Sequence, residues 1–177
     1  PGCTIELPES LVQIGEYAFY NCSNLTGTLN IYASLIQARS FIGCSGLTSI
    51  NFLGATTNLS GNCFQGCTGL TSIDLTHCNI SNATACFRGC TGLTSVTFDD
   101  STTKLPEYLF EDCTGLTSIQ LPKALDSIEN YAFSGCTNLR TVDMPNSLTR
   151  LGPGAFRYCS SLEGIVIPDG ITTIYNG

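Results

Sequence analysis

Residues 110–121 read FEDCTGLTSIQL, and this stretch recurs along the chain at an almost constant interval. Phe110 stands three residues before Cys113, and Leu116 stands three residues after it. The same spacing occurs seven times in the 177 residues, and successive cysteines of the series are 22 or 23 residues apart. The repeated pairs, which we call the Phe–Cys ladder, are Phe19 and Cys22, Phe41 and Cys44, Phe64 and Cys67, Phe87 and Cys90, Phe110 and Cys113, Phe133 and Cys136, and Phe156 and Cys159. Self-similarity at this period indicates a solenoid of stacked units.

Each unit continues with a short segment in which apolar and polar residues alternate, such as Ile119-Gln120-Leu121. Alternation with a period of two is typical of a β-strand with one buried face. Residues 70–80 also fit the leucine-rich pattern L-x-x-L-x-L-x-x-N/C-x-L, with Cys78 at the Asn/Cys position. A single unit has too few apolar residues to offset its ordering entropy, so the units must stack and pair their strands in parallel.

The pattern therefore predicts an α/β repeat solenoid. We expect a leucine-rich-repeat array with a parallel β-sheet on the concave face and short turns or helical pieces in the opposite arm. One array of about seven to eight units of 22–23 residues accounts for residues 1–177. We expect a fragment of a longer array, because neither end reads as a capping repeat with a polar outer face.

The unit resembles the BspA-like leucine-rich repeat, also called the Treponema-type repeat. The resemblance is nearly complete at Leu121, Pro122, Leu125, Ile128, Ala132, Phe133, Cys136 and Leu139. The middle units depart from it, because they lack the Leu-Pro pair and replace the alanine by Cys63, Cys86 or Leu109. Members of this family are typically long surface or secreted proteins, and several are implicated in adhesion. The resemblance implies a non-catalytic protein-binding module in an extracellular or cell-surface location.

The composition excludes several classes of protein. Acidic residues outnumber basic ones by 14 to 7, which leaves a formal net charge of −7. Nucleic-acid binders rely on Lys and Arg to neutralise phosphates, so nucleic acid is not an expected partner. No apolar run approaches the roughly 18–20 residues of a membrane span, so we expect no span in this segment. With 42% hydrophobic and 12% charged residues, the chain is not a disordered acidic tail.

The outward face of the predicted sheet is the candidate binding surface. One polar residue stands between the two buried positions of each strand, and these residues are Glu6, Asn30, Asn51, Asp74, Thr97, Gln120 and Asp143. Solenoids commonly present such a face to a protein or an extended peptide. The face has almost no Trp, Tyr or Arg, the residues that anchor binding hot spots, so the alternative is a solvated face without a partner. If the face binds, its carboxylates favour a basic partner.

The cysteines allow three interpretations. Cys63, Cys67, Cys86 and Cys90 form two C-x-x-x-C pairs, and four thiolates are the number that a structural zinc site uses. Disulfides between neighbouring units are a second possibility, although side chains stacked in one direction suit the torsion of the bond poorly. We favour the third, in which small buried thiols pack like hydrophobic groups and donate weakly to turn carbonyls. We therefore expect no metal and no cofactor.

No catalytic residue is expected. His77 is the only histidine, and nothing around it resembles a nucleophile of a serine or cysteine catalytic site. The acidic residues at 99–100 and 107–112 lack the spacing of a calcium-binding loop. By the 23-residue spacing, Cys78 belongs to a column with Ala55 and Ser101, and we interpret it as another packing thiol.

Two hypotheses for the function follow. The first is a binding module whose partner is a host or matrix protein, contacted through the sheet face or an open end. The second is a structural scaffold subunit, whose partners are neighbouring subunits of a larger assembly. Both lack catalytic activity, and they differ in whether a separate partner or the assembly itself covers the exposed surface.

Overall fold

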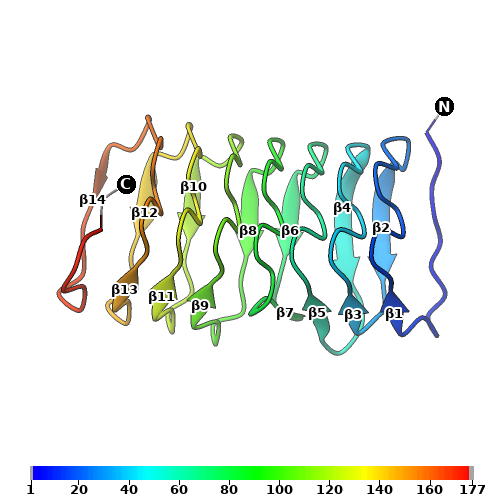
Figure 1. Ribbon diagram of the computed structural model, residues 1–177, viewed down its shortest axis with the longest axis horizontal. Helices are drawn as coiled ribbons and strands as arrows, with labels where there is room; N and C mark the ends of the chain where they lie inside the picture. The colour runs from blue at the N-terminus through cyan, green and yellow to red at the C-terminus, as the bar shows by residue number, and fades with distance from the viewer. Residues whose placement is uncertain (1, 176–177) are drawn as a thin grey trace.

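The computed structural model describes residues 2–175 as a single row of stacked turns (Figure 1). We call each turn a rung and number the rungs 1 to 7 by their ladder phenylalanines, from Phe19 to Phe156. Each of rungs 2 to 7 places one strand on one side of the row and a shorter strand on the opposite side. Among the described residues, rung 1 has no strand on the side of the longer strands, and an isolated parallel bridge between Cys3 and Leu25 connects it to that side.

The first side, the strand face, carries the longer strands. It consists of β2 (Gly27–Ile31), β4 (Leu47–Phe52), β6 (Ser72–Asp74), β8 (Ser95–Thr97), β10 (Ser118–Gln120), β12 (Thr141–Asp143) and β14 (Gly164–Ile165). Paired strands run parallel and one repeat apart, as Ile119 opposite Val142 illustrates. The expected parallel pairing is confirmed, but within residues 2–175 it forms three sheets, β2–β4, β6–β8 and β10–β12–β14, rather than one continuous sheet. The register between β2 and β4 shifts by one residue between Gly27, whose φ is +83°, and Thr28.

The opposite side, the arm, also consists of parallel strands. They are β1 (Gln13–Ile14), β3 (Leu35–Ile36), β5 (Thr57–Leu59), β7 (Cys78–Asn79), β9 (Lys104–Leu105), β11 (Ser127–Ile128) and β13 (Arg150–Leu151). The α/β assignment and the expected helical pieces are wrong, because residues 2–175 contain strands and turns but no helix. A repeat of 22–23 residues that forms two strand segments and their turns leaves too few consecutive residues for a helix of several turns.

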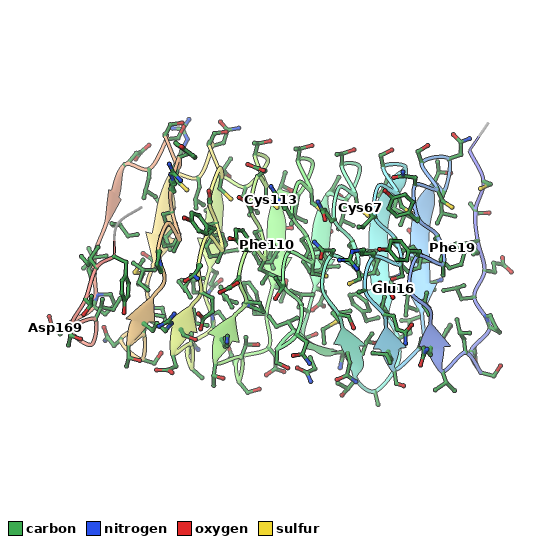
Figure 2. All side chains as sticks on the ribbon, viewed as in Figure 1. Glu16, Phe19, Cys67, Phe110, Cys113 and Asp169 are labelled. Atoms are coloured by element: carbon green, nitrogen blue, oxygen red, sulfur yellow. The ribbon has the colours of Figure 1, made fainter. Side chains whose placement is uncertain are left out.

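The Phe–Cys ladder fills the interior between the two faces. Neighbouring phenylalanine rings lie nearly parallel, with centroids 4.9 to 5.8 Å apart from Phe19 to Phe156. Figure 2 shows Phe19 and Phe110 on one line along the solenoid, with Cys67 and Cys113 on a second line. The five rings from Phe41 to Phe133 are fully buried. Aromatic stacking and apolar burial therefore join each rung to the next.

Two residues of every rung adopt the left-handed backbone conformation. They stand two residues before and two residues after the ladder phenylalanine, and the positions before it are Tyr17, Arg39, Asn62, Ala85, Tyr108, Tyr131 and Gly154. The positions after it are Asn21, Gly43, Gly66, Gly89, Asp112, Gly135 and Tyr158. These φ values lie between +54° and +74°. The turn around each phenylalanine therefore bends the chain twice at fixed points, whichever residue is present there.

Rung 4 departs from the common register. Leu59 of the arm follows Ile50 of the strand face by nine residues, whereas Ile80 follows Ile73 by only seven. Cys78 consequently pairs with Thr57, and the predicted column with Ala55 is wrong. Two extra residues between Ile80 and the next ladder phenylalanine restore the period. Among residues 2–175 no strand pairing joins β7 to β9, so the arm is divided at this rung.

Candidate functional site

The strand face places the predicted polar residues in one row. The structure aligns Asn30 with Asn51, Asp74 with Thr97 and Gln120 with Asp143, each pair on neighbouring strands. All six side chains are exposed, and Glu6 is exposed beside them in an irregular segment ahead of β1. A second row of hydroxyl-bearing residues precedes the first by two positions and includes Thr28, Ser49, Ser72, Ser95, Ser118 and Thr141.

Hydrogen bonds between rungs organise part of this polar surface. The Nδ2 group of Asn51 donates to Oδ1 of Asn30 at 2.9 Å, and the hydroxyl groups of Thr28 and Ser49 lie 2.7 Å apart. Oδ1 of Asp74 instead accepts from the backbone N–H and the hydroxyl of Thr76, at 2.9 and 2.8 Å. The first rungs of the face are therefore internally bonded, whereas the carboxylate of Asp74 is held in place and directed to solvent.

Most of the cationic side chains are in ion pairs, and one of these pairs, Arg140–Glu163, stands directly before the strand-face strands β12 and β14. Five of the seven Lys and Arg residues form ion pairs, which are Arg39–Glu16, Arg88–Glu111, Lys104–Glu129, Arg150–Glu129 and Arg140–Glu163. Glu129 is nearly buried and links three arm strands, with Lys104 at 3.4 Å and Arg150 at 3.2 Å. Within the described part of the chain, no cation pairs with Asp74 or Asp143. The strand face therefore keeps uncompensated negative charge.

The aromatic residues that the strand face lacks lie along the turns around the ladder. Tyr17 and Tyr20 are each 49% exposed, and their rings meet edge to face at 5.6 Å. The guanidinium of Arg39 lies 5.7 Å from the ring of Tyr17 and pairs with Glu16. This group, the tyrosine edge, was not predicted. The signal in the sequence is the shared position of Tyr17 and Arg39, two residues before a ladder phenylalanine, although the same position is occupied by the buried Ala85 in rung 4.

The ladder thiols are directed to backbone carbonyls. The Sγ atoms of Cys67 and Cys90 donate to the carbonyl oxygens of Phe41 and Phe64, at 3.3 and 3.2 Å, and the same bond recurs in the later rungs. Burial raises the pKa of the Cys67 thiol well above its ordinary value. Thiols that are protonated and bonded to carbonyls do not converge on a common point. Among residues 2–175 no group of three or more His, Cys, Asp and Glu residues has an arrangement that could hold a metal ion.

The interruption at rung 4 leaves a pocket of about 350 Å³ that His77, Cys78, Asp99 and Lys104 help to line. Burial raises the pKa of Cys78, the opposite of what a cysteine nucleophile requires. Hydrogen bonds from the hydroxyl and the backbone N–H of Ser101 lower the pKa of Asp99. His77 is exposed, and in the described chain its ring has no hydrogen bond to a nucleophile or a carboxylate. The pocket therefore lacks the nucleophile–base–orienting group arrangement of a catalytic site.

Comparison with protein families gives one match that spans the chain. The BspA type leucine rich repeat region matches residues 3–85 and 79–177, with six copies. A comparison with curated proteins finds no match. In residues 2–175 the structure has no helix that is long and apolar enough to cross a membrane. The family match indicates no enzyme family and is that of a leucine-rich repeat, a module that typically binds proteins.

Solved structures show the same fold. A leucine-rich repeat protein of T. pallidum is 25% identical, with a TM-score of 0.77 over 91% of this chain and 78% of that one. A leucine-rich repeat protein from Bacteroides ovatus is 31% identical, with a TM-score of 0.63 over 91% of this chain and 48% of that one. A leucine rich cell surface protein from Faecalibacterium prausnitzii shares the fold at 22% identity and a TM-score of 0.55, over 96% of this chain and 68% of that one. On its repeat, its fold and the family match, the chain belongs to the BspA-type leucine-rich repeat family.

Proposed function

We propose that this chain is a non-catalytic protein-binding module of a surface or secreted protein, and that its strand face contacts a basic segment of the partner. The observation that carries the proposal is the distribution of charge. Asp74 and Asp143 are exposed on the strand face, and neither forms an ion pair with a described residue, whereas the ion pairs of the chain engage Glu16, Glu111, Glu129 and Glu163. Unpaired surface carboxylates attract and orient a basic partner.

The shape of the strand face suits an extended or flat partner. Its seven strands, spaced about 4.8 Å apart, form a surface about 30 Å long. The two rows consist of small or medium-sized polar side chains on successive rungs, so a partner can contact several rungs at once. The exposed tyrosines Tyr17, Tyr20 and Tyr158 lie in the turns around the ladder rather than on this face. We therefore infer that polar and charged contacts dominate the binding.

An extracellular or cell-surface location and a role in adhesion follow from family membership as parts of the same proposal. Leucine-rich repeats of this type typically bind proteins, and host or matrix proteins are the partners that such a location makes available. The absence of a nucleophile–base arrangement in the rung 4 pocket supports a role without catalysis.

The test compares two double variants that change the formal charge equally. Asp74→Lys with Asp143→Lys reverses the charge of the strand face, and Glu9→Lys with Asp169→Lys makes the same change at exposed positions outside it. Each protein is passed over a panel of purified, immobilised extracellular matrix proteins in surface plasmon resonance. We expect the strand-face variant to lose at least tenfold in affinity for a matrix protein that binds the wild type, and the control variant to lose less than twofold.

A third variant separates the strand face from the tyrosine edge. Tyr17→Ala with Tyr20→Ala removes the exposed aromatic pair without changing the charge. If this variant loses binding and the Asp74/Asp143 variant does not, the strand face is not the site. If no matrix protein binds the wild type and the protein sediments as a concentration-dependent oligomer, the scaffold hypothesis replaces the binding module.

A further inference from the structure

The eleven cysteines fall into groups with different surroundings. In the described chain, which includes all of them, every cysteine is a free thiol. Six ladder thiols, those of Cys44, Cys67, Cys90, Cys113, Cys136 and Cys159, donate to the carbonyl of the ladder phenylalanine one rung earlier, at 3.0 to 3.3 Å. Cys63 and Cys86 are different. Their Sγ atoms lie 2.9 Å from each other, in the interior between rungs 3 and 4.

The Sγ atoms of Cys63 and Cys86 are side-chain hydrogen-bond partners of each other. Both are 0% exposed, and neither sulfur donates to a carbonyl among the described hydrogen bonds. The corresponding positions of other rungs have Ala18, Ser40, Leu109, Ala132 and Ala155. Only rungs 3 and 4 thus place sulfur at this position, and they are adjacent.

The backbone holds the two residues one rung apart. The N–H of Phe64, the residue after Cys63, donates to the carbonyl oxygen of Cys86 at 3.0 Å. Neighbouring parallel segments about 4.8 Å apart fall inside the Cα separation of roughly 4.4–6.8 Å that disulfides span. A bond between the sulfur atoms requires them to approach by less than 1 Å from 2.9 Å, to the S–S length of about 2.05 Å. Small rotations about the side-chain bonds supply this approach without moving the rungs.

We propose that Cys63 and Cys86 form a disulfide that cross-links rung 3 to rung 4, whereas the ladder thiols stay reduced. The oxidant is a small-molecule disulfide, such as oxidised glutathione. One cysteine thiolate attacks it and releases one thiol, and the second cysteine thiolate then attacks the mixed disulfide and releases the other. The two cysteines together give up two protons and two electrons, and the oxidant is reduced to two thiols. This chemistry fits the oxidising compartments outside the cytosol.

Burial determines when the bond forms. Desolvation raises the pKa of the Cys86 thiol well above its ordinary value, so the folded, reduced protein has almost no reactive thiolate there. The exchange therefore takes place before rungs 3 and 4 close. Once the rungs close, the same burial shields the bond from reductants in solution. The cross-link lies beside the interruption in the arm, where the strands β7 and β9 do not pair.

The test maps the cysteine partners after refolding in a glutathione redox buffer. The wild-type protein is refolded and shown to be folded by circular dichroism. It is then quenched with acid, unfolded, alkylated and cut with trypsin and an endoprotease that cleaves before aspartate. Cleavage after Arg39, before Asp74, after Arg88 and before Asp99 gives peptides 40–73, 74–88 and 89–98. We expect peptides 40–73 and 74–88 to be joined in most molecules, with fragmentation assigning the bond to Cys63 and Cys86.

Two variants and one internal comparison complete the design. Cys86→Ala introduces a residue that three other rungs have at this position, and it should abolish the joined peptide while the protein still folds. Cys90→Ala should keep it. Cys67 and Cys90 are as buried and as far apart in sequence, yet no product joining 40–73 to 89–98 is expected. Recovery of Cys63 and Cys86 as alkylated thiols, or a bond through Cys78, overturns the proposal. Resistance of the bond to dithiothreitol in the folded protein, and its reduction after unfolding, would support it.

Discussion

The Sγ of Cys113 donates a hydrogen bond to the carbonyl oxygen of Phe87, 3.1 Å away and one rung earlier. The equivalent carbonyl of Phe110 accepts in two directions, from the backbone N–H of Cys113 in its own rung and from the Sγ of Cys136 in the next. A thiol therefore links the turn of each rung to the preceding rung. This bond explains why the ladder position is occupied by cysteine rather than by a small aliphatic residue.

Replacing Cys113 by alanine removes the sulfur and its hydrogen bond from a fully buried site. We expect Cys113→Ala to lower the free energy of unfolding by about 1–3 kcal/mol. Cys22→Ala is the matched control, because Cys22 occupies the same position of the repeat in rung 1 but is exposed. Chemical denaturation should show a change within about 0.5 kcal/mol for the control. Equal losses in the two variants would show that the cross-rung bond contributes nothing.

Phe110 is stacked between Phe87 and Phe133, with centroid distances of 5.7 and 5.6 Å. Phe110→Ala leaves a cavity in the middle of the row and should cost about 3–5 kcal/mol. Phe19→Ala should cost less, because Phe19 is only partly buried and stacks on one side alone. Thermal unfolding followed by circular dichroism measures both variants. A larger loss for Phe19→Ala would contradict the view that stacking from both sides stabilises the rungs.

The left-handed positions give a pair of opposite predictions. A Cβ atom at Gly66, with φ of +71°, has no neighbour closer than 3.7 Å, so Gly66→Ala tests backbone conformation alone. We expect a loss of about 1–2 kcal/mol, and a smaller loss for Gly66→Asn, because Asn21 already adopts this conformation at the same position of rung 1. Ala85, with φ of +54°, should gain about 0.5–1 kcal/mol on replacement by glycine.

Urea denaturation of the three variants checks both signs. Stabilisation by Gly66→Ala, or a clear destabilisation by Ala85→Gly, would contradict the assignment of these positions to the left-handed region.

Alkaline pH should destabilise the reduced protein. Burial raises the pKa of the Cys44 and Cys159 thiols from 9.0 to about 11, because the folded state disfavours the thiolate. Between pH 9 and pH 11 the unfolded chain loses these protons while the folded chain keeps them. The contribution of these two thiols to the free energy of unfolding is therefore fully present below pH 9, and it is lost as the pH rises from 9 to 11.

Denaturation in the presence of a phosphine reductant, at half-unit steps of pH, measures the decline. Cys44→Ala should make it shallower, because one of the thiols that ionise only in the unfolded chain is then absent. A stability that is constant from pH 9 to pH 11 would show that the ladder thiols ionise as easily in the folded as in the unfolded chain.

The repeat, the parallel strands and the ladder were predictable from the sequence. A stack of rungs brings identical positions together, so the side chains that form the core must recur with the period of the chain. The row of polar residues on the strand face was predictable for the same reason, because a strand alternates buried and exposed residues. The helical pieces in the arm were a wrong expectation, drawn from the general leucine-rich pattern rather than from any helical periodicity in this chain.

Other features do not alter the 22–23-residue repeat, so the repeat could not predict them, and only the tertiary structure determined them. In rung 4 the segment between the strand face and the arm is two residues shorter, and the segment between the arm and Phe87 is two residues longer. The 23-residue spacing is therefore unaffected, while Cys78 lies opposite Thr57. The left-handed positions carry Tyr, Arg and Ala as well as Gly, so composition does not identify them. The approach of Cys63 to Cys86 and the ion pairs of Glu129 depend on side-chain rotation across rungs. A sequence repeat specifies which residues stack, whereas the direction in which each side chain points is decided by the space and the partners that the neighbouring rungs provide.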